Sequence, residues 1–138
     1  MKVVFLIVIG FVILHSEFIK NGDIVIDSKT KLEWQDDLVG SNMEWEVAIT
    51  HCEELTLGGY YDWRLPNINE LKTIVDRSKV NPSIVDIFIH TSYNRYWSST
   101  SRASDKHRAW VIHFGNGNVY PYYDKNDSKY VRCVRAGQ

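Results

Sequence analysis

Several features that organise longer proteins are missing from this chain of 138 residues. It has no internal repeat, no low-complexity tract and no linker segment, so the sequence indicates neither a tandem array nor several domains. Cysteine and proline are scarce, at two and three residues, and the net charge is only −1. With 44% hydrophobic and 24% charged residues, the chain is expected to form one globular domain with a hydrophobic core.

The patterns of the common catalytic and metal sites are also missing. The five histidines show no metal-ligand spacing, and no glycine-rich loop is suited to bind phosphate. Ser98, Ser99 and Ser101 lack the flanking glycines that expose a nucleophilic serine. Asp36 and Asp37 are adjacent carboxylates, but in a predicted turn we expect such a pair to be solvated. We therefore predict a protein that is not an enzyme and that uses no cofactor and no metal.

Residues 3–14 form the one long apolar run, and it follows the positively charged Lys2. A run of about twelve residues suits the core of a signal peptide, whereas a membrane-spanning helix needs about twenty. We predict that residues 1–16 direct export and are cleaved near Ser16. The mature protein would then be secreted, periplasmic or at the cell surface, without a stable membrane span. An uncleaved N-terminal anchor stays open, because Leu14 is not the small residue preferred two positions before a cleavage site.

Export matters for Cys52 and Cys133, because disulfides form in oxidising compartments. A bridge between them would close a loop of about eighty residues, which the chain-entropy model stabilises by roughly 4 to 5 kcal/mol. Two free, buried thiols are the alternative. The residues themselves do not decide between the two.

Hydrophobic periodicity predicts both helices and strands within one domain. Two short strands with a polar turn between them open the domain, at residues 23–27 and 31–35. Ser41 and Glu44 form a capping box, which predicts that a first helix starts there and continues with apolar residues at helical spacing.

The most informative stretch has the sequence GGYYDWRLPNINEL. Its glycines can take the positive φ that ends a helix, and Pro66 favours an extended chain just before it. Asn67 and Glu70 form a second capping box, so a second helix is predicted to start there. Trp63 is expected in the core, and Arg64 beside it is expected to be a structural hydrogen-bond hub rather than a ligand contact.

The C-terminal half is predicted to be rich in strands. An irregular segment follows the second helix. Apolar alternation then indicates strands over residues 96–99, 109–114, 119–123 and 130–135. A glycine-rich turn of sequence GNG joins the second of these strands to the third.

The chain resembles the domain at the C-terminus of the Legionella collagen-like adhesin in five ordered motifs: DWRLPNINEL, WSSTS, the Ala109–Trp110 pair that opens a strand, GNG, and VRCVR near the end. The resemblance covers residues 22–136, nearly the whole mature chain, and implies a single domain over that range. It implies a C-type-lectin-like α+β fold, in which two helices pack on a small twisted antiparallel sheet with long loops. Such domains commonly tie their first helix to their last strand, so the resemblance favours a disulfide between Cys52 and Cys133. It also implies an adhesin-like role, because the best-studied member binds sulfated polysaccharide.

The sugar-binding calcium motifs of true C-type lectins are missing from this chain. The triplet LPN at residues 65–67 lacks the acidic residue that such a motif needs. An EF-hand-like start at Asp124 is also interrupted, because Lys129 replaces the required glycine and Arg135 replaces the closing glutamate. Calcium-dependent sugar binding is therefore not expected, and a single structural calcium of another kind stays open.

The C-terminal third is the basic part of the chain. Residues 101–138 hold 7 Lys or Arg against 3 acids, whereas residues 17–100 hold 8 against 14. Two predicted loops carry the candidate ligands for a polyanion, which are Arg102, Lys106, Arg108, Lys125 and Lys129. If these loops converge, they form a cationic edge that attracts sulfate or carboxylate groups. Two separate, solvated loops are the alternative.

Tyr120 and Tyr122 are candidate stacking platforms for sugar rings, because alternation places them on the same side of a strand. We therefore predict a non-catalytic exported module that binds anionic or sulfated polysaccharide. The alternative is a protein-interaction or oligomerisation module of the cell envelope, whose partner is a surface protein or a second copy of the chain. Nucleic acid is not expected as a partner.

Overall fold

The computed structural model describes residues 2–5, 7, 17–38 and 40–137. The predicted signal peptide and its cleavage site at Ser16 therefore lie largely outside the described residues. The elements follow in the order β1 (Phe18–Asn21), β2 (Ile24–Asp27), β3 (Leu32–Gln35), α1 (Trp45–Glu53), α2 (Ile68–Lys72), β4 (Arg95–Arg102), β5 (Asp105–His113), β6 (Val119–Asp124) and β7 (Val134–Ala136). Within these ranges, no helix has both the length and the apolar character needed to cross a membrane.

One antiparallel sheet has the strand order β1-β2-β3-β7. The predicted opening hairpin is present as β2 and β3, with Val25 opposite Trp34. β1 was not among the predicted strands. It pairs with β2, with Phe18 opposite Asp27 at one end of the pairing. Its four residues, FIKN, are too few to show an alternating pattern.

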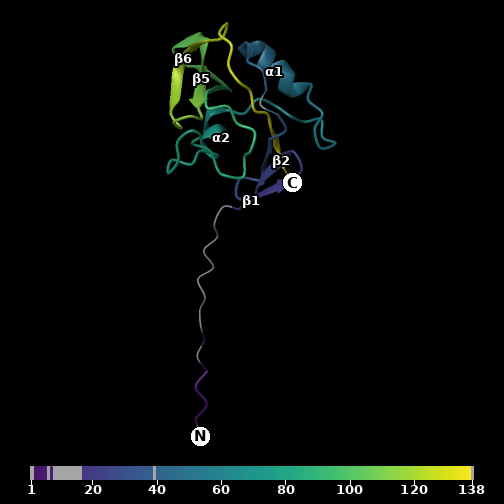
Figure 1. Ribbon diagram of the computed structural model, residues 1–138, viewed down its shortest axis with the longest axis vertical. Coiled ribbons are helices and arrows are strands. Elements are labelled where there is room, and N and C mark those ends of the chain that lie inside the picture. The colour runs from purple at the N-terminus through teal and green to yellow at the C-terminus, as the bar shows by residue number, and fades with distance from the viewer. Residues whose placement is uncertain (1, 6, 8–16, 39, 138) are drawn as a thin grey trace.

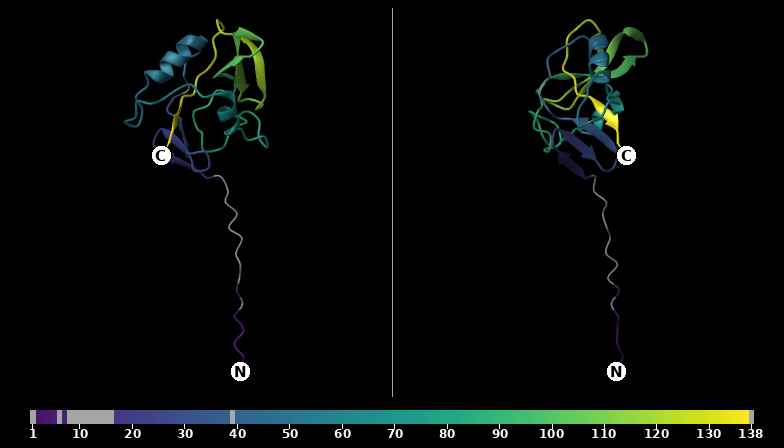
Figure 2. Two further views of the ribbon diagram at one scale, coloured as in Figure 1. Left: turned by 180° about the vertical axis from the view of Figure 1, so that it is seen from behind. Right: turned by 90° about the vertical axis from the view of Figure 1, so that its right-hand side faces the viewer.

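A second antiparallel sheet has the order β4-β5-β6, so the single sheet expected from the sequence is in fact two sheets. The strand predicted at residues 130–135 divides between them. Its first part runs beside β4, where the Trp97 N–H donates to the Tyr130 carbonyl at 2.9 Å. Its last part, β7, pairs with β3. Figures 1 and 2 show this C-terminal segment, in yellow, passing from one sheet to the other beside α1.

α1 starts later than the capping box at Ser41 predicted. Met43 exchanges two backbone hydrogen bonds of 3.0 Å with Lys129, which hold the chain extended before the helix, and the N-cap residue makes no side-chain hydrogen bond.

The second capping box, at the start of α2, is present as predicted. The Asn67 side chain accepts from the Glu70 N–H at 2.8 Å, and the Glu70 carboxylate accepts from the Asn67 N–H at 2.9 Å.

The segment between the helices is held against α2 and β7. Trp63 is buried, and so is Pro66. The guanidinium of Arg64 donates to the two carboxylate oxygens of Glu70 at 2.7 Å each, while its backbone exchanges two hydrogen bonds with Val134. Burial alone would raise the pKa of Glu70, but the bonds from Arg64 and the backbone outweigh it and lower that pKa.

β4 is buried on both of its faces from Tyr96 to Ser98, because successive strand residues point in opposite directions. Tyr96 points into one hydrophobic core and its neighbour Trp97 into a second. The second core contains the disulfide between Cys52 of α1 and Cys133, which directly precedes β7, with a Cα–Cα distance of 5.4 Å. The bridge, rather than a pair of free thiols, is therefore present.

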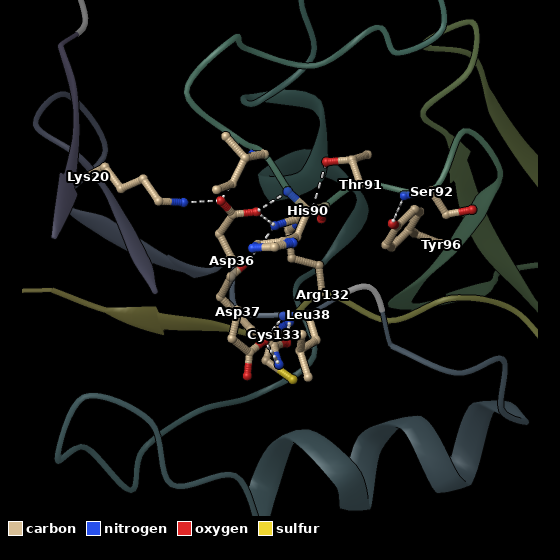
Figure 3. Close-up of polar contacts among 12 residues, drawn as sticks. Lys20, Asp36, Asp37, Leu38, His90, Thr91, Ser92, Tyr96, Arg132 and Cys133 are labelled. Carbon is tan, nitrogen blue, oxygen red and sulfur yellow. Dashed lines mark hydrogen bonds and ion pairs between the residues drawn. The ribbon is translucent and has the colours of Figure 1, made fainter. Parts of the chain in front are cut away.

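The sequence led us to expect Asp36 in a solvated turn, and this prediction is wrong. Its side chain is buried beside Arg132, and Figure 3 shows Lys20 of β1 reaching it from the opposite direction. One carboxylate oxygen accepts from the Ile89 N–H at 3.1 Å, and the other accepts from the His90 N–H and from Arg132 at 3.1 Å each. These partners come from three distant segments, which explains why the local sequence was misleading.

We expect acid to destabilise the fold through Asp36. Burial alone would raise the pKa of this carboxyl, but the hydrogen bonds from Lys20 and from the backbone, together with the charge of Arg132, outweigh burial and hold the pKa below its ordinary value of 3.8. A pKa that is depressed in the folded state stabilises the protein above the ordinary pKa. This contribution is lost as the pH falls below that value and through the folded-state pKa.

Urea unfolding of the wild type and of Asp36→Asn, from neutral pH down to about pH 2, measures this effect. The variant should be less stable at neutral pH, and the difference should shrink on acidification below about pH 4. Asp37→Asn is the matched control, because Asp37 is partly exposed and lies outside the network around Arg132. A difference between wild type and Asp36→Asn that stays constant with pH would contradict the assignment.

Candidate binding surface

Three of the predicted cationic ligands lie in a β-hairpin rather than in a loop. Arg102 ends β4 and is paired with Asp105, while Lys106 and Arg108 belong to β5. The sequence did not indicate this part of the hairpin because its side chains are polar. Arg108 is held in place, since its Nε lies 3.4 Å from the Asp105 carboxylate and its Nη1 donates to the Tyr122 carbonyl at 2.8 Å.

The other two predicted cations, Lys125 and Lys129, follow β6 in a loop, as predicted. The Lys125 ammonium donates to the Ser101 hydroxyl at 2.7 Å and lies 3.8 Å from the centre of the Trp45 ring. The Lys129 ammonium lies 4.5 Å from the centre of the Tyr123 ring. Both lysines are therefore held against neighbouring side chains instead of extending into solvent.

Lys106 and Lys125 come together across the two segments. They line a surface hollow of about 330 Å³ with Glu46, His107, Asp124 and Asn126. Two carboxylates share the hollow with the two ammonium groups, so it is a mixed-charge site rather than a purely cationic one.

The basic excess of the C-terminal third is smaller at the surface than in the sequence. Arg132 and Arg135 are only 3% and 4% exposed, and they pair with Asp36 and with Glu33 and Asp62 respectively. Two of the seven basic residues counted there are therefore engaged inside the fold. A count along the chain cannot separate such residues from surface charges.

Three tyrosine rings meet on β6. Tyr122 stacks on Tyr123 with 5.1 Å between ring centroids and an interplanar angle of 29°. Tyr120 contacts both rings, at 5.8 and 6.3 Å. Strict alternation would place neighbouring residues on opposite faces, but the pairing of β5 with β6 is irregular and gives β6 one extra residue in the stretch that contains Pro121. This bulge brings Tyr123 into the group, which the sequence did not predict.

Two cations lie over the ring of Tyr123. The guanidinium carbon of Arg95 is 5.1 Å from the ring centre, and the Lys129 ammonium is 4.5 Å from it. Arg95 belongs to β4, whereas Tyr123 belongs to β6, so only the order of strands in the sheet could reveal this contact. We call this set the tyrosine–cation surface, and it comprises Arg95, Tyr120, Tyr122, Tyr123 and Lys129.

The positive charge of Arg95 contributes to lowering the pKa of three neighbouring side chains, those of Lys129, His113 and Tyr120. Burial lowers the pKa of Lys129, Asp127 raises it, and Arg95 lowers it by less than Asp127 raises it. His113 lies opposite Arg95 in β5, and its pKa is lowered by burial first and then by Arg95. The pKa of Tyr120 is lowered mainly by hydrogen bonds with asparagine side chains, with a smaller contribution from Arg95. Arg95 therefore places a positive charge close to all three groups.

The structure divides the predicted ligands into two groups. Lys129, Tyr120 and Tyr122 belong to the tyrosine–cation surface, and Arg108 borders it through the Tyr122 carbonyl. The remaining three, Arg102, Lys106 and Lys125, lie at the β4–β5 hairpin and the hollow beside it. Throughout the part of the chain that the structure describes, no group of three or more His, Cys, Asp or Glu side chains could hold a metal ion.

The Lcl C-terminal domain is a protein family whose profile matches this chain over residues 23–135. No curated protein matches the chain. The matched region runs from the start of the β2 hairpin into β7, and it contains both cysteines and the whole tyrosine–cation surface. Because the match covers most of the chain, this protein belongs to the Lcl C-terminal domain family.

Proposed function

We propose that this domain is a non-catalytic exported binding module that recognises anionic or sulfated polysaccharide at the bacterial cell surface. The observation that carries the proposal is the tyrosine–cation surface, where three aromatic rings and two cations lie together. The C–H faces of sugar rings are apolar and stack on aromatic rings, while sulfate and carboxylate groups pair with cations. An anionic polysaccharide is the class of ligand that offers both kinds of group.

A polymer bound at this surface would find further cations on the same sheet. Arg108 borders the tyrosine–cation surface, and the neighbouring hairpin carries Arg102 and Lys106. Within the described ranges, neither Arg102 nor Lys106 makes a side-chain hydrogen bond or an ion pair, so both charges are available to a ligand. These three predicted polyanion ligands thus extend the surface, whereas Lys129 belongs to it.

The surface also has a rigid support. The disulfide between Cys52 and Cys133 ties α1 to the chain before β7, and the same chain runs beside β4. We propose that this arrangement is C-type-lectin-like, because a helix near the start of the domain is fastened to the chain near its end. A rigid sheet favours binding, since its side chains lose little conformational freedom when a ligand arrives.

Calorimetric titration of the domain with heparin tests the proposed function. We expect binding that weakens on the order of a hundredfold for a fourfold rise in salt, if about four cations release counterions as they do on DNA. Neutral dextran should not bind. An affinity for heparin that is independent of salt would contradict the proposal. So would a concentration-dependent oligomer in light scattering without any polysaccharide binding, which would favour a protein-interaction module instead.

A further inference from the structure

We propose that Arg95 and Lys129 form a subsite for a single sulfate or carboxylate group, with the ring of Tyr123 beneath them. This inference rests on the proposed function and names the residues that would hold the charged group of the sugar. Arg95 is not among the cations that the sequence indicated, and Tyr123 is not among the predicted stacking rings. The subsite therefore has a different centre from the predicted cationic edge.

The first argument is the close approach of two like charges. The groups of Arg95 and Lys129 both lie within about 5 Å of one ring centre, as their distances of 5.1 and 4.5 Å show. Neither side chain forms an ion pair with a carboxylate anywhere in the described part of the chain. Arg95 lowers the pKa of Lys129 and Asp127 raises it, so an acidic neighbour is already present, and an anion bound beside both cations would further reduce their mutual repulsion.

The second argument is an unsatisfied donor. The Nε–H of Arg95 is buried and has no hydrogen-bond partner among the described residues. Buried polar groups are nearly always paired, and this covered donor could meet an external acceptor only if the Arg95 side chain shifted on binding. A sulfate or carboxylate oxygen supplies such an acceptor, and a charge-assisted bond to it is stronger than a neutral one.

The third argument is that the subsite is built in advance. The Arg95 carbonyl accepts from the Tyr130 N–H at 2.9 Å, and Arg95 is paired with His113 in the sheet, so its backbone is fixed on both sides. Lys129 is fixed by the two backbone bonds of its own residue to Met43. Tyr122 stacks on Tyr123 and is 46% exposed, which leaves a ring for the sugar beside the charged group.

Heparin titrations of single variants test the subsite. Arg95→Gln and Lys129→Gln should each weaken binding roughly tenfold, the equivalent of one charge-assisted hydrogen bond. Arg95→Lys keeps the charge and should retain part of the affinity. Tyr123→Phe keeps the ring and should bind like the wild type, whereas Tyr123→Leu should bind several-fold more weakly. Lys29→Gln removes a lysine charge from the β2–β3 turn of the other sheet and should have little effect.

An NMR titration of His113 measures an effect that would not occur if Arg95 had only a structural role. Its Nδ1 accepts from the Gly115 N–H at 2.9 Å, and Arg95 lies opposite it in the sheet. Inorganic sulfate should raise the pKa of His113 in the wild type, because a bound anion offsets the charge of Arg95. Chloride at equal ionic strength should not. In Arg95→Gln the pKa should already be raised, and sulfate should have no further effect.

The outcomes separate the subsite from the proposed function. If heparin binds but Arg95→Gln and Lys129→Gln bind it as well as the wild type, the subsite is wrong and the proposed function stands. A variant pair Arg102→Gln and Lys106→Gln that loses binding in that case would assign the site to the hairpin. If the wild type binds no anionic polysaccharide, the proposed function itself fails. Hyaluronan, which carries carboxylates alone, distinguishes a carboxylate from a sulfate as the group that is held.

Discussion

Loss of the disulfide between Cys52 and Cys133 is expected to destabilise the folded domain by about 4 to 5 kcal/mol. The bridge joins residues separated by 81 positions, so its removal frees a long loop in the unfolded chain and raises the entropy of that state. Both cysteines are fully buried in the second core, so the loss also affects the contact between α1 and the chain before β7. A domain of this size has a total stability of roughly 5 to 15 kcal/mol, so the effect is large.

Urea unfolding of the wild type, with and without a reducing agent, measures this loss. The double variant Cys52→Ala and Cys133→Ala serves as a second measurement, because it removes the bridge without leaving reactive thiols. The variant should lose slightly more stability than the reduced wild type, since alanine leaves small cavities in the core. A stability that changes by less than about 1 kcal/mol on reduction would show that the bridge does not restrict the unfolded chain.

Replacing Arg132 by methionine is expected to destabilise the domain by about 3 to 5 kcal/mol. The side chain is 3% exposed. It donates to the carboxylate of Asp36 and to the carbonyls of Gln35 and His90, and it also donates to the hydroxyl of Thr91. Methionine has a similar length but no donor, so these buried acceptors would lose their partner.

Arg77→Met is the matched control for this experiment. Arg77 is exposed and forms no ion pair in the part of the chain that the structure describes, so its replacement should change stability by no more than about 0.5 kcal/mol. A double variant of Asp36→Asn with Arg132→Met adds a further test. It should lose less stability than the two single changes together, because the two residues interact directly. Additive losses would show that Arg132 acts through its carbonyl partners alone.

The parts of the fold that the sequence predicted correctly depend on residues close together in the chain. The capping box of Asn67 and Glu70 is one example, because both hydrogen bonds span three positions. The hairpin of β2 and β3 and the turn between β5 and β6 are others, since glycine, polar turn residues and short apolar runs mark them locally. The capping box at Ser41 failed because a distant partner, Lys129, holds the chain extended there.

The candidate binding surface was only partly predictable for the same reason. Lys129, Tyr120 and Tyr122 were identified from charge and alternation, and they are members of the tyrosine–cation surface. Arg95 and Tyr123 were not identified, because the contact of Arg95 depends on β4 and β6 lying in the same sheet, and the position of Tyr123 depends on a bulge. Arg132 and Arg135 were counted with the surface charges, although they pair with acidic side chains inside the fold.

The amino-acid sequence by itself determined the family, the α+β class, the helix start after Pro66, and the two cysteines that alone could form a bridge. The helix stop predicted at Gly58 and Gly59 was wrong, because α1 already ends at Glu53. Only the tertiary structure decided that the strands form two sheets, that Asp36 is buried, and that Arg95 and Lys129 share one aromatic ring. The difference is physical. Caps and turns depend on dihedral preferences over a few residues, whereas the environment of a side chain depends on which distant segments pack beside it.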